Sequence, residues 1–205
     1  MREVLLLKAK HATLKAMPLI PKHPRIAPTA PPFDDDTRAA LDILGPPIAL
    51  FGVFARRPDR AHAIAGWGRY YLSRRGALSL RHRELAIDRT TARCGAGYEW
   101  GIHIAVYAGK AGLTDEQVAS LATGDPADAC WTDPADRAVL ATVDALHQRA
   151  DLDDAEWQTL LDAVGEDAAV GLLLLCGWYH AISFAVNALR LPAEPGTPAL
   201  PGRSR

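Results

Sequence analysis

Alanine and leucine recur through the central part of this chain, and glycine or proline interrupts them at short intervals. Alanine and leucine are strong helix formers, whereas glycine and proline usually end a helix. No stretch shows the strict alternation of apolar and polar residues that is typical of a half-buried β-strand. The sequence therefore predicts an all-α fold with neither a strand nor an internal repeat.

Several expected helix ends carry chemical signatures. Thr114 and Gln117 form a capping-box pattern, Asp153 begins an acidic version of it, and Gly112 and Gly165 are typical helix stops. Asp133 precedes a proline at the first position of another expected helix. Together these signals mark the ends of the expected helices. The expected helices cover residues 36–44, 47–56, 58–74, 79–94, 96–111, 114–122, 133–149, 153–164 and 166–190.

The two ends of the chain differ from this core in composition. Residues 1–34 are rich in lysine, arginine and proline, and their proline spacing favours extended backbone beyond Met17. We expect an arm there that packs over a neighbouring subunit or stays mobile. Residues 192–205 repeat proline and glycine without an apolar period, which predicts a disordered tail. A single helical domain is expected over residues 35–191.

Length and charge limit the classes of function. A chain of 205 residues with 49% hydrophobic residues is long enough for one well-buried core. Its formal net charge of -1 provides no excess of positive charge for a nucleic acid or an anionic membrane. We therefore expect a small, roughly neutral substrate or a protein surface as the partner, with no nucleic acid and no membrane.

Cysteine content and hydropathy indicate the compartment. The three cysteines are odd in number and form no CxxC pair, which is typical of a reducing environment. The apolar run near the N-terminus is too short for a signal peptide. Residues 168–189 carry no charge and are long enough to span a bilayer, but polar groups such as His180 and Asn187 favour a buried core helix. We therefore expect a cytoplasmic protein.

The segment from Glu84 to His103 concentrates acid and base chemistry. Glu84 lies in a stripe with Leu80, Ile87 and Thr91, so it interrupts a row that should face the core. Burial would raise the pKa of a carboxyl group there towards the range useful for proton transfer. The alternative is a structural ion pair between Glu84 and a nearby arginine.

The next expected helix places Glu99 and His103 four residues apart, with Tyr98 and Trp100 on adjacent faces. At this spacing the carboxylate and the imidazole can touch or converge on one ligand, which suits a general acid or base. The same pair also occurs on solvated helix surfaces. No HExxH motif and no second Glu-x-x-His are present, so no metal is expected.

Two further groups are candidate ligand contacts. Cys94 stands just before the second helix, where a helix N-terminus can lower the pKa of a thiol; the alternative is a small buried residue. On the apolar last helix, Tyr179 and His180 either face a pocket or satisfy backbone groups.

These motifs resemble a known family. Arg83-Glu84-Leu-Ala-Ile, then Tyr98-Glu99-Trp100-Gly-Ile-His103, then Ala111-Gly112-Leu113-Thr114 resemble the carboxymuconolactone decarboxylase family, also called AhpD-like. The resemblance is strongest over residues 79–122 and extends more weakly over 36–191. It implies an AhpD-like all-α bundle that needs no cofactor and assembles as a homo-oligomer, such as a dimer, trimer or hexamer.

The resemblance also assigns roles to residues. Glu84 matches the proton-relay glutamate of the peroxidase branch and His103 its histidine, but the two cysteine positions are Ala96 and Glu99 here. Without two thiols in register, the disulfide cycle of that branch is not expected. The decarboxylase-like branch implies His103 as the acid or base, Glu84 as its partner, and Glu99 and Tyr98 as residues that shape the pocket. Expected substrate contacts are Cys94, Trp100, Tyr179 and His180.

Three hypotheses follow. The first is acid/base chemistry, decarboxylation or a related proton transfer, on a small oxygenated carboxylic acid or lactone. The second is a thiol peroxidase that uses Cys94. The third is a non-catalytic oligomeric binding protein whose arm, residues 1–34, engages a partner.

Overall fold

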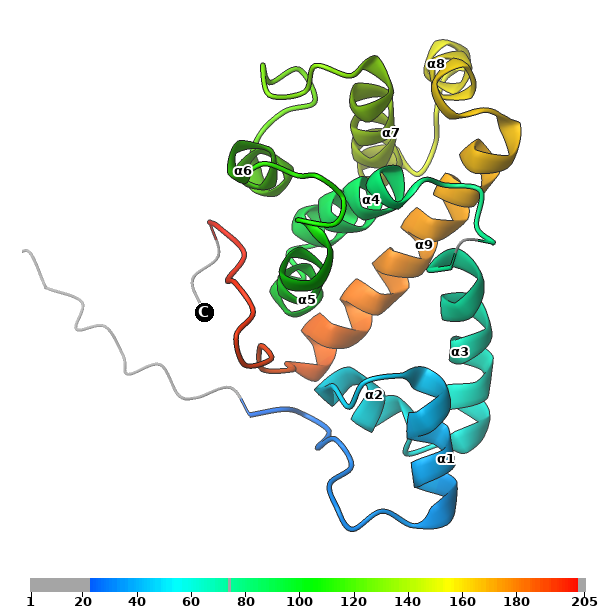
Figure 1. Cartoon of the computed structure of the whole chain (residues 1–205), viewed down its shortest axis with the longest axis vertical. Coiled ribbons are helices and arrows are strands. Elements are labelled where there is room, and N and C mark those ends of the chain that lie inside the picture. The colour runs from blue at the N-terminus through cyan, green and yellow to red at the C-terminus, as the bar shows by residue number, and fades with distance from the viewer. Residues whose placement is uncertain (1–22, 74, 203–205) are drawn as a thin grey trace, which may run out of the picture.

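The computed structural model describes residues 23–73 and 75–202, and within these ranges its regular elements are all helices, without a strand (Figure 1). This confirms the all-α prediction. The helices are α1 (Asp35–Leu44), α2 (Ala49–Phe54), α3 (Pro58–Tyr71), α4 (Leu80–Arg93), α5 (Gly97–Tyr107), α6 (Asp115–Thr123), α7 (Pro134–Arg149), α8 (Asp154–Val164) and α9 (Glu166–Leu189).

The helix ends follow the capping residues closely. The Thr114 side chain accepts from the Gln117 amide while the Gln117 side chain accepts from the Thr114 amide, and Asp153 with Glu156 repeats this box at α8. The largest difference from the predicted ends is at α5, which stops at Tyr107 rather than residue 111. A turn closed by the Leu113 amide on the Ala108 carbonyl, with Gly112 at positive φ, takes its place.

Helix α4 lies at the centre of the fold, in contact with α5, α6, α7 and α9. Every residue from Arg83 to Thr91 is buried, although several are charged. Buried charges need partners, and α7 supplies two. Asp144 accepts from both Arg89 and Arg93, and Asp136 accepts from Arg81 at 2.7 Å. These ion pairs fix the orientation of α4 and so of its carboxylates.

Helix α9 crosses the molecule diagonally, with α4 and α5 on one side and α3 on the other (Figure 1). Its buried face, including Leu172, Leu175 and Tyr179, packs into the main core with Leu85 and Ile87 of α4. Among the described helices, α9 alone is long and apolar enough to cross a membrane by length and composition, with a mean hydropathy of 1.8. An apolar core helix of a folded bundle meets the same criterion.

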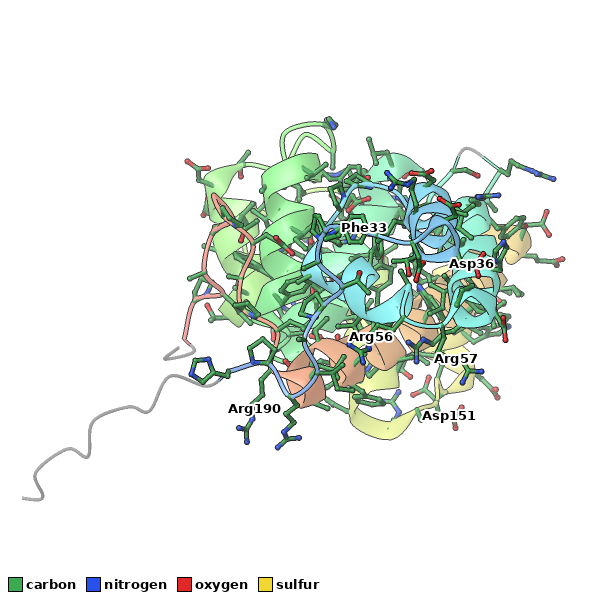
Figure 2. All side chains as sticks on the ribbon, turned by 90° about the horizontal axis from the view of Figure 1, so that it is seen from below. Phe33, Asp36, Arg56, Arg57, Asp151 and Arg190 are labelled. Carbon is green, nitrogen blue, oxygen red and sulfur yellow. The ribbon has the colours of Figure 1, made fainter. Side chains whose placement is uncertain are left out.

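The described part of the N-terminal arm lies against the helices. Residues 1–22 fall outside the described residues, but residues 23–33 run over α2 between the labelled Phe33 and the neighbourhood of Arg190 (Figure 2). The Arg25 amide donates to the Leu189 carbonyl, and the Thr29 amide donates to Gly52. A Cβ on Gly52 would lie 2.8 Å from the Pro28 side chain, so the close approach requires glycine there.

The C-terminal segment differs from the disordered tail that its composition predicted. Residues 192–202 run beside α5 (Figure 1), and Leu200 is buried. The Pro198 carbonyl packs so closely on Gly101 that a Cβ on this glycine would lie 2.7 Å from the carbonyl oxygen. Glu194 accepts hydrogen bonds from the Ala49 amide and from the Tyr98 hydroxyl. Close packing on the distant Gly101, and hydrogen bonds from the distant Ala49 and Tyr98 to Glu194, therefore hold a segment that has no apolar period of its own.

Candidate functional site

Two adjacent helices bring Glu84 and His103 together. Ser79 caps α4 by accepting from the His82 amide, and Glu84 follows one turn later on the face towards α5. Gly95 at positive φ turns the chain from α4 into α5, which carries His103. Glu84 is fully buried and His103 is 4% exposed, so their contact is made away from bulk water.

The His103 ring is held at both nitrogens. Its Nδ1 lies 2.8 Å from Glu84 Oε2, and its Nε2 lies 3.0 Å from the Tyr179 hydroxyl and 3.5 Å from Glu99 Oε1. The second Glu84 oxygen accepts from Arg83 Nε at 2.8 Å. Glu84 on the Nδ1 side, and Tyr179 and Glu99 on the Nε2 side, therefore fix the orientation of the His103 ring.

Two carboxylates decide the charge of this ring. Burial alone would lower the pKa of His103, but hydrogen bonds that the ring donates to Glu84 and Glu99 outweigh burial and raise the pKa to about 10. His103 is therefore an imidazolium at neutral pH, with both N–H groups donating. The neighbouring Tyr179 stays a neutral phenol, because burial raises its pKa well above the usual value.

A pocket of about 540 Å³ opens beside His103, within the usual size range for small-molecule sites. Glu99, His103, Tyr107 and Tyr179 form its polar wall. Helices α1, α2 and α3 cover the opposite side with apolar side chains, and α9 adds two more. The apolar lining includes Leu50, Phe51, Phe54, Ile64, Trp178 and Ile182. The pocket therefore suits a ligand with an apolar body and one polar, reacting end.

The structure places the predicted residues in three different settings. Glu99, His103 and Tyr179 line the pocket, with Glu84 behind His103. Tyr98 and Trp100 are buried but are not among the pocket residues. The Tyr98 hydroxyl donates to Glu194 at 2.5 Å and accepts from the Leu50 amide at 3.1 Å, so it holds the C-terminal segment and α2.

Cys94 and His180 lie in a separate cluster. Cys94 Sγ is 3.9 Å from Nδ1 of His147, and that nitrogen is 3.0 Å from His180 Nε2. None of these three residues lines the pocket. His147 was not singled out by sequence reasoning, because it stands alone near the end of α7 and its neighbours come from distant helices.

Asp88 is the buried acid that sequence reasoning missed. It follows Glu84 by one turn of α4, is fully buried, and neither of its oxygens has a hydrogen-bond partner among the described residues. Burial raises the pKa of Asp88 well above its usual value, because the charged form is poorly solvated there. Its spacing of four from Glu84 is the signal that was available.

Two groups of described side chains are close enough to share a metal ion. One comprises Glu84, Asp88 and His103, and the other comprises Cys94, His147 and His180; in each, the possible ligand atoms lie within 4.8 Å of one another. In the first group Arg83 already bonds to Glu84, and His103 carries a proton. The Glu84, Asp88 and His103 group therefore suits a bound proton better than a metal ion.

Comparison with family models finds a match over part of the chain. No curated protein matches the chain. Residues 58–145 match the model of the carboxymuconolactone decarboxylase family, a range that runs from α3 into α7 and contains Glu84, Glu99 and His103. Helix α9 with Tyr179 lies beyond it. The matched family is the one that the sequence motifs resemble.

Proposed function

We propose that this protein catalyses decarboxylation, or a related proton transfer, on an oxygenated carbon acid with an apolar body. The observation that carries the proposal is the position of His103, which is protonated, buried between two carboxylates, and exposed on one side to a ligand-sized pocket. A proton donor that is fixed in a water-poor site is the main requirement for general acid catalysis.

The chemical step uses groups that the pocket supplies. Loss of CO₂ from a substrate carboxylate leaves an electron pair on carbon, which a conjugated carbonyl of the substrate delocalises. His103 Nε2–H delivers a proton to that carbon, and the neutral imidazole regains a proton from water after product release. Glu84 holds the ring in place through Nδ1 and stabilises its charged form.

The lining of the pocket narrows the class of substrate. Arg69 lies on the pocket wall and is solvent-exposed, so its guanidinium can pair with a substrate carboxylate at the rim. The buried Glu99 Oε2 has no hydrogen-bond partner among the described residues and can accept from a substrate hydroxyl. The apolar side chains of α2 and α3 then bind the remainder. These features favour a monocarboxylate with one hydroxyl or lactone group.

The experiment screens oxygenated carboxylic acids and lactones for CO₂ release and for deuterium incorporation at carbon in D₂O. With a turned-over compound, we expect His103→Gln and Glu84→Gln each to lower kcat by about 10²-fold or more. The matched control is His62→Gln, an exposed histidine of α3 that bonds to the Pro58 carbonyl and should keep wild-type turnover. Equal kcat values for the wild type and His103→Gln would reject the proposal.

A further inference from the structure

The second histidine cluster joins three helices at the surface. Cys94 caps the end of α4, His147 lies in the last turn of α7, and His180 lies in the middle of α9. All three side chains are at least partly exposed and none contacts the pocket. A thiol and two imidazoles from distant parts of the chain therefore converge at a place that the acid/base chemistry does not use. We propose that they form a binding site for Zn²⁺.

The distances agree with tetrahedral coordination. Zn–N bonds of about 2.0–2.1 Å and a Zn–S bond of about 2.3 Å place two nitrogen ligands roughly 3.3 Å apart, and nitrogen and sulfur roughly 3.6 Å apart. The observed separations are 3.0 Å between the two histidine nitrogens and 3.9 Å between Cys94 Sγ and His147 Nδ1. These two separations differ from the tetrahedral values by a few tenths of an ångström, and the possible ligand atoms of all three residues lie within 4.8 Å of one another.

The neighbouring groups orient the ligands. His180 donates Nδ1–H to the Cys176 carbonyl at 2.8 Å, so in the neutral ring Nε2 is the nitrogen with the lone pair, and it points at His147. A ligating histidine usually has its second nitrogen fixed in this way. Asn187 donates to the Cys94 carbonyl at 3.0 Å and fixes the backbone that carries the thiol.

The charges favour the ligand forms of the side chains. Burial lowers the pKa of His147, and the nearby His180 and Arg93 lower it further, so His147 is a neutral imidazole at neutral pH. The positive charge of Arg93 is compensated by two hydrogen bonds to Asp144. A cation at the site would displace the Cys94 thiol proton and pair with the thiolate.

The donor set selects the metal. One thiolate with two imidazoles is a combination that Zn²⁺ accepts readily, and three protein ligands leave the fourth position for water or an external ligand. Because the ligands come from α4, α7 and α9, bound Zn²⁺ would also cross-link the helices that support Glu84 and Tyr179. The inference does not depend on the proposed acid/base reaction.

The test uses the untagged full chain with Zn²⁺ and Co²⁺ alone. We expect chelator competition to show one tight Zn²⁺ site, and Co²⁺ to produce thiolate-to-cobalt charge-transfer absorption. Cys94→Ser should abolish that absorption, and His180→Gln should weaken Zn²⁺ binding more than about 100-fold, because loss of an outer partner alone typically costs about 10–100-fold.

Two matched controls locate the site. Cys130→Ser removes another partly exposed thiol, and Asp88→Asn changes the buried acidic group; neither should alter binding. If wild-type protein gives no cobalt–thiolate absorption, or if Cys94→Ser and His180→Gln bind Zn²⁺ as tightly as wild type, the proposal is wrong. The wild-type spectrum requires no variant, so a folding defect in a variant leaves the test decisive.

Discussion

The protein contains two histidine clusters whose environments shift the pKa of a histidine in opposite directions. Around His103, carboxylates at both ring nitrogens raise the pKa to about 10 despite burial. Around His147, burial together with a second imidazole and an arginine lowers the pKa. The imidazole side chain is therefore held in its charged form in the pocket and in its neutral form at the surface.

The two clusters show that neighbouring carboxylates can outweigh the effect of burial on the pKa of a histidine, and that burial prevails where such carboxylates are lacking. Burial disfavours the charged form in both clusters. Only the pocket cluster contains carboxylates at hydrogen-bond distance, and these come from Glu84 on α4 and Glu99 on α5. Removing a carboxylate should therefore change the first cluster far more than any single change alters the second.

The largest expected effect is on stability when Glu84 is neutralised. Glu84→Gln leaves the buried Arg83 and His103 without their shared carboxylate, and we expect a loss of about 3 kcal/mol in the free energy of unfolding. Urea denaturation measures it. The control is Glu156→Gln, which removes the charge of an exposed partner of Arg149 and should lower the free energy of unfolding far less than Glu84→Gln does. Equal losses in both variants would contradict the comparison.

The next effect is a pH dependence with a defined sign. The folded-state pKa of His103 is raised above its unfolded value of about 6.5, so its contribution is fully present below that pH. The contribution is lost as the pH rises through about 10. The difference in unfolding free energy between the wild type and His103→Gln should fall by at least about 1.4 kcal/mol across this window. A difference that stays constant would show that His103 is not charged.

Tyr179→Phe tests the contact at Nε2 of His103, and we expect a smaller effect from it. The substitution removes the oxygen 3.0 Å from His103 Nε2 and keeps the aromatic packing of α9. We expect turnover to fall by roughly 10-fold, equivalent to about 1.4 kcal/mol, with the wild-type helical circular dichroism retained. Tyr70→Phe, at an exposed position of α3, is the matched control. Unchanged turnover in Tyr179→Phe would remove Tyr179 from the site.

The smallest effect belongs to the surface cluster in the absence of metal. His147→Gln keeps most of the side-chain volume at a partly exposed position, so we expect the free energy of unfolding to change by no more than about 0.5 kcal/mol. The measurement is urea denaturation with a chelator present. A loss as large as that of Glu84→Gln would show that the two clusters are equally structural.

Sequence reasoning reached the helices through local signals, whereas the pairing of Glu84 with His103 came from the resemblance to a known family. Caps, glycine stops and a carboxylate within an apolar stripe can be read along the chain. The far wall of the pocket could not be read in this way. It comes from α1, α2 and α3, whose position relative to α5 depends on long-range packing rather than on a motif.

The terminal segments and the surface cluster were missed for a similar reason. Gly52 and Gly101 look like ordinary helix residues until the chain segments that pack against them are known. His147 gains its partners from α4 and α9, which approach it only in the folded bundle. Pairing across distant helices is information that a single sequence expresses weakly.

The most direct test of the account is the protonation state of the His103 ring. Nitrogen-15 NMR of histidine-labelled protein, assigned with His103→Gln, reports whether each ring nitrogen carries a proton. At pH 7.5 we expect both His103 nitrogens to be protonated, while His147 is neutral. A neutral His103 that titrates near its ordinary pKa of about 6.5 would contradict the claim that two carboxylates hold a proton beside the pocket.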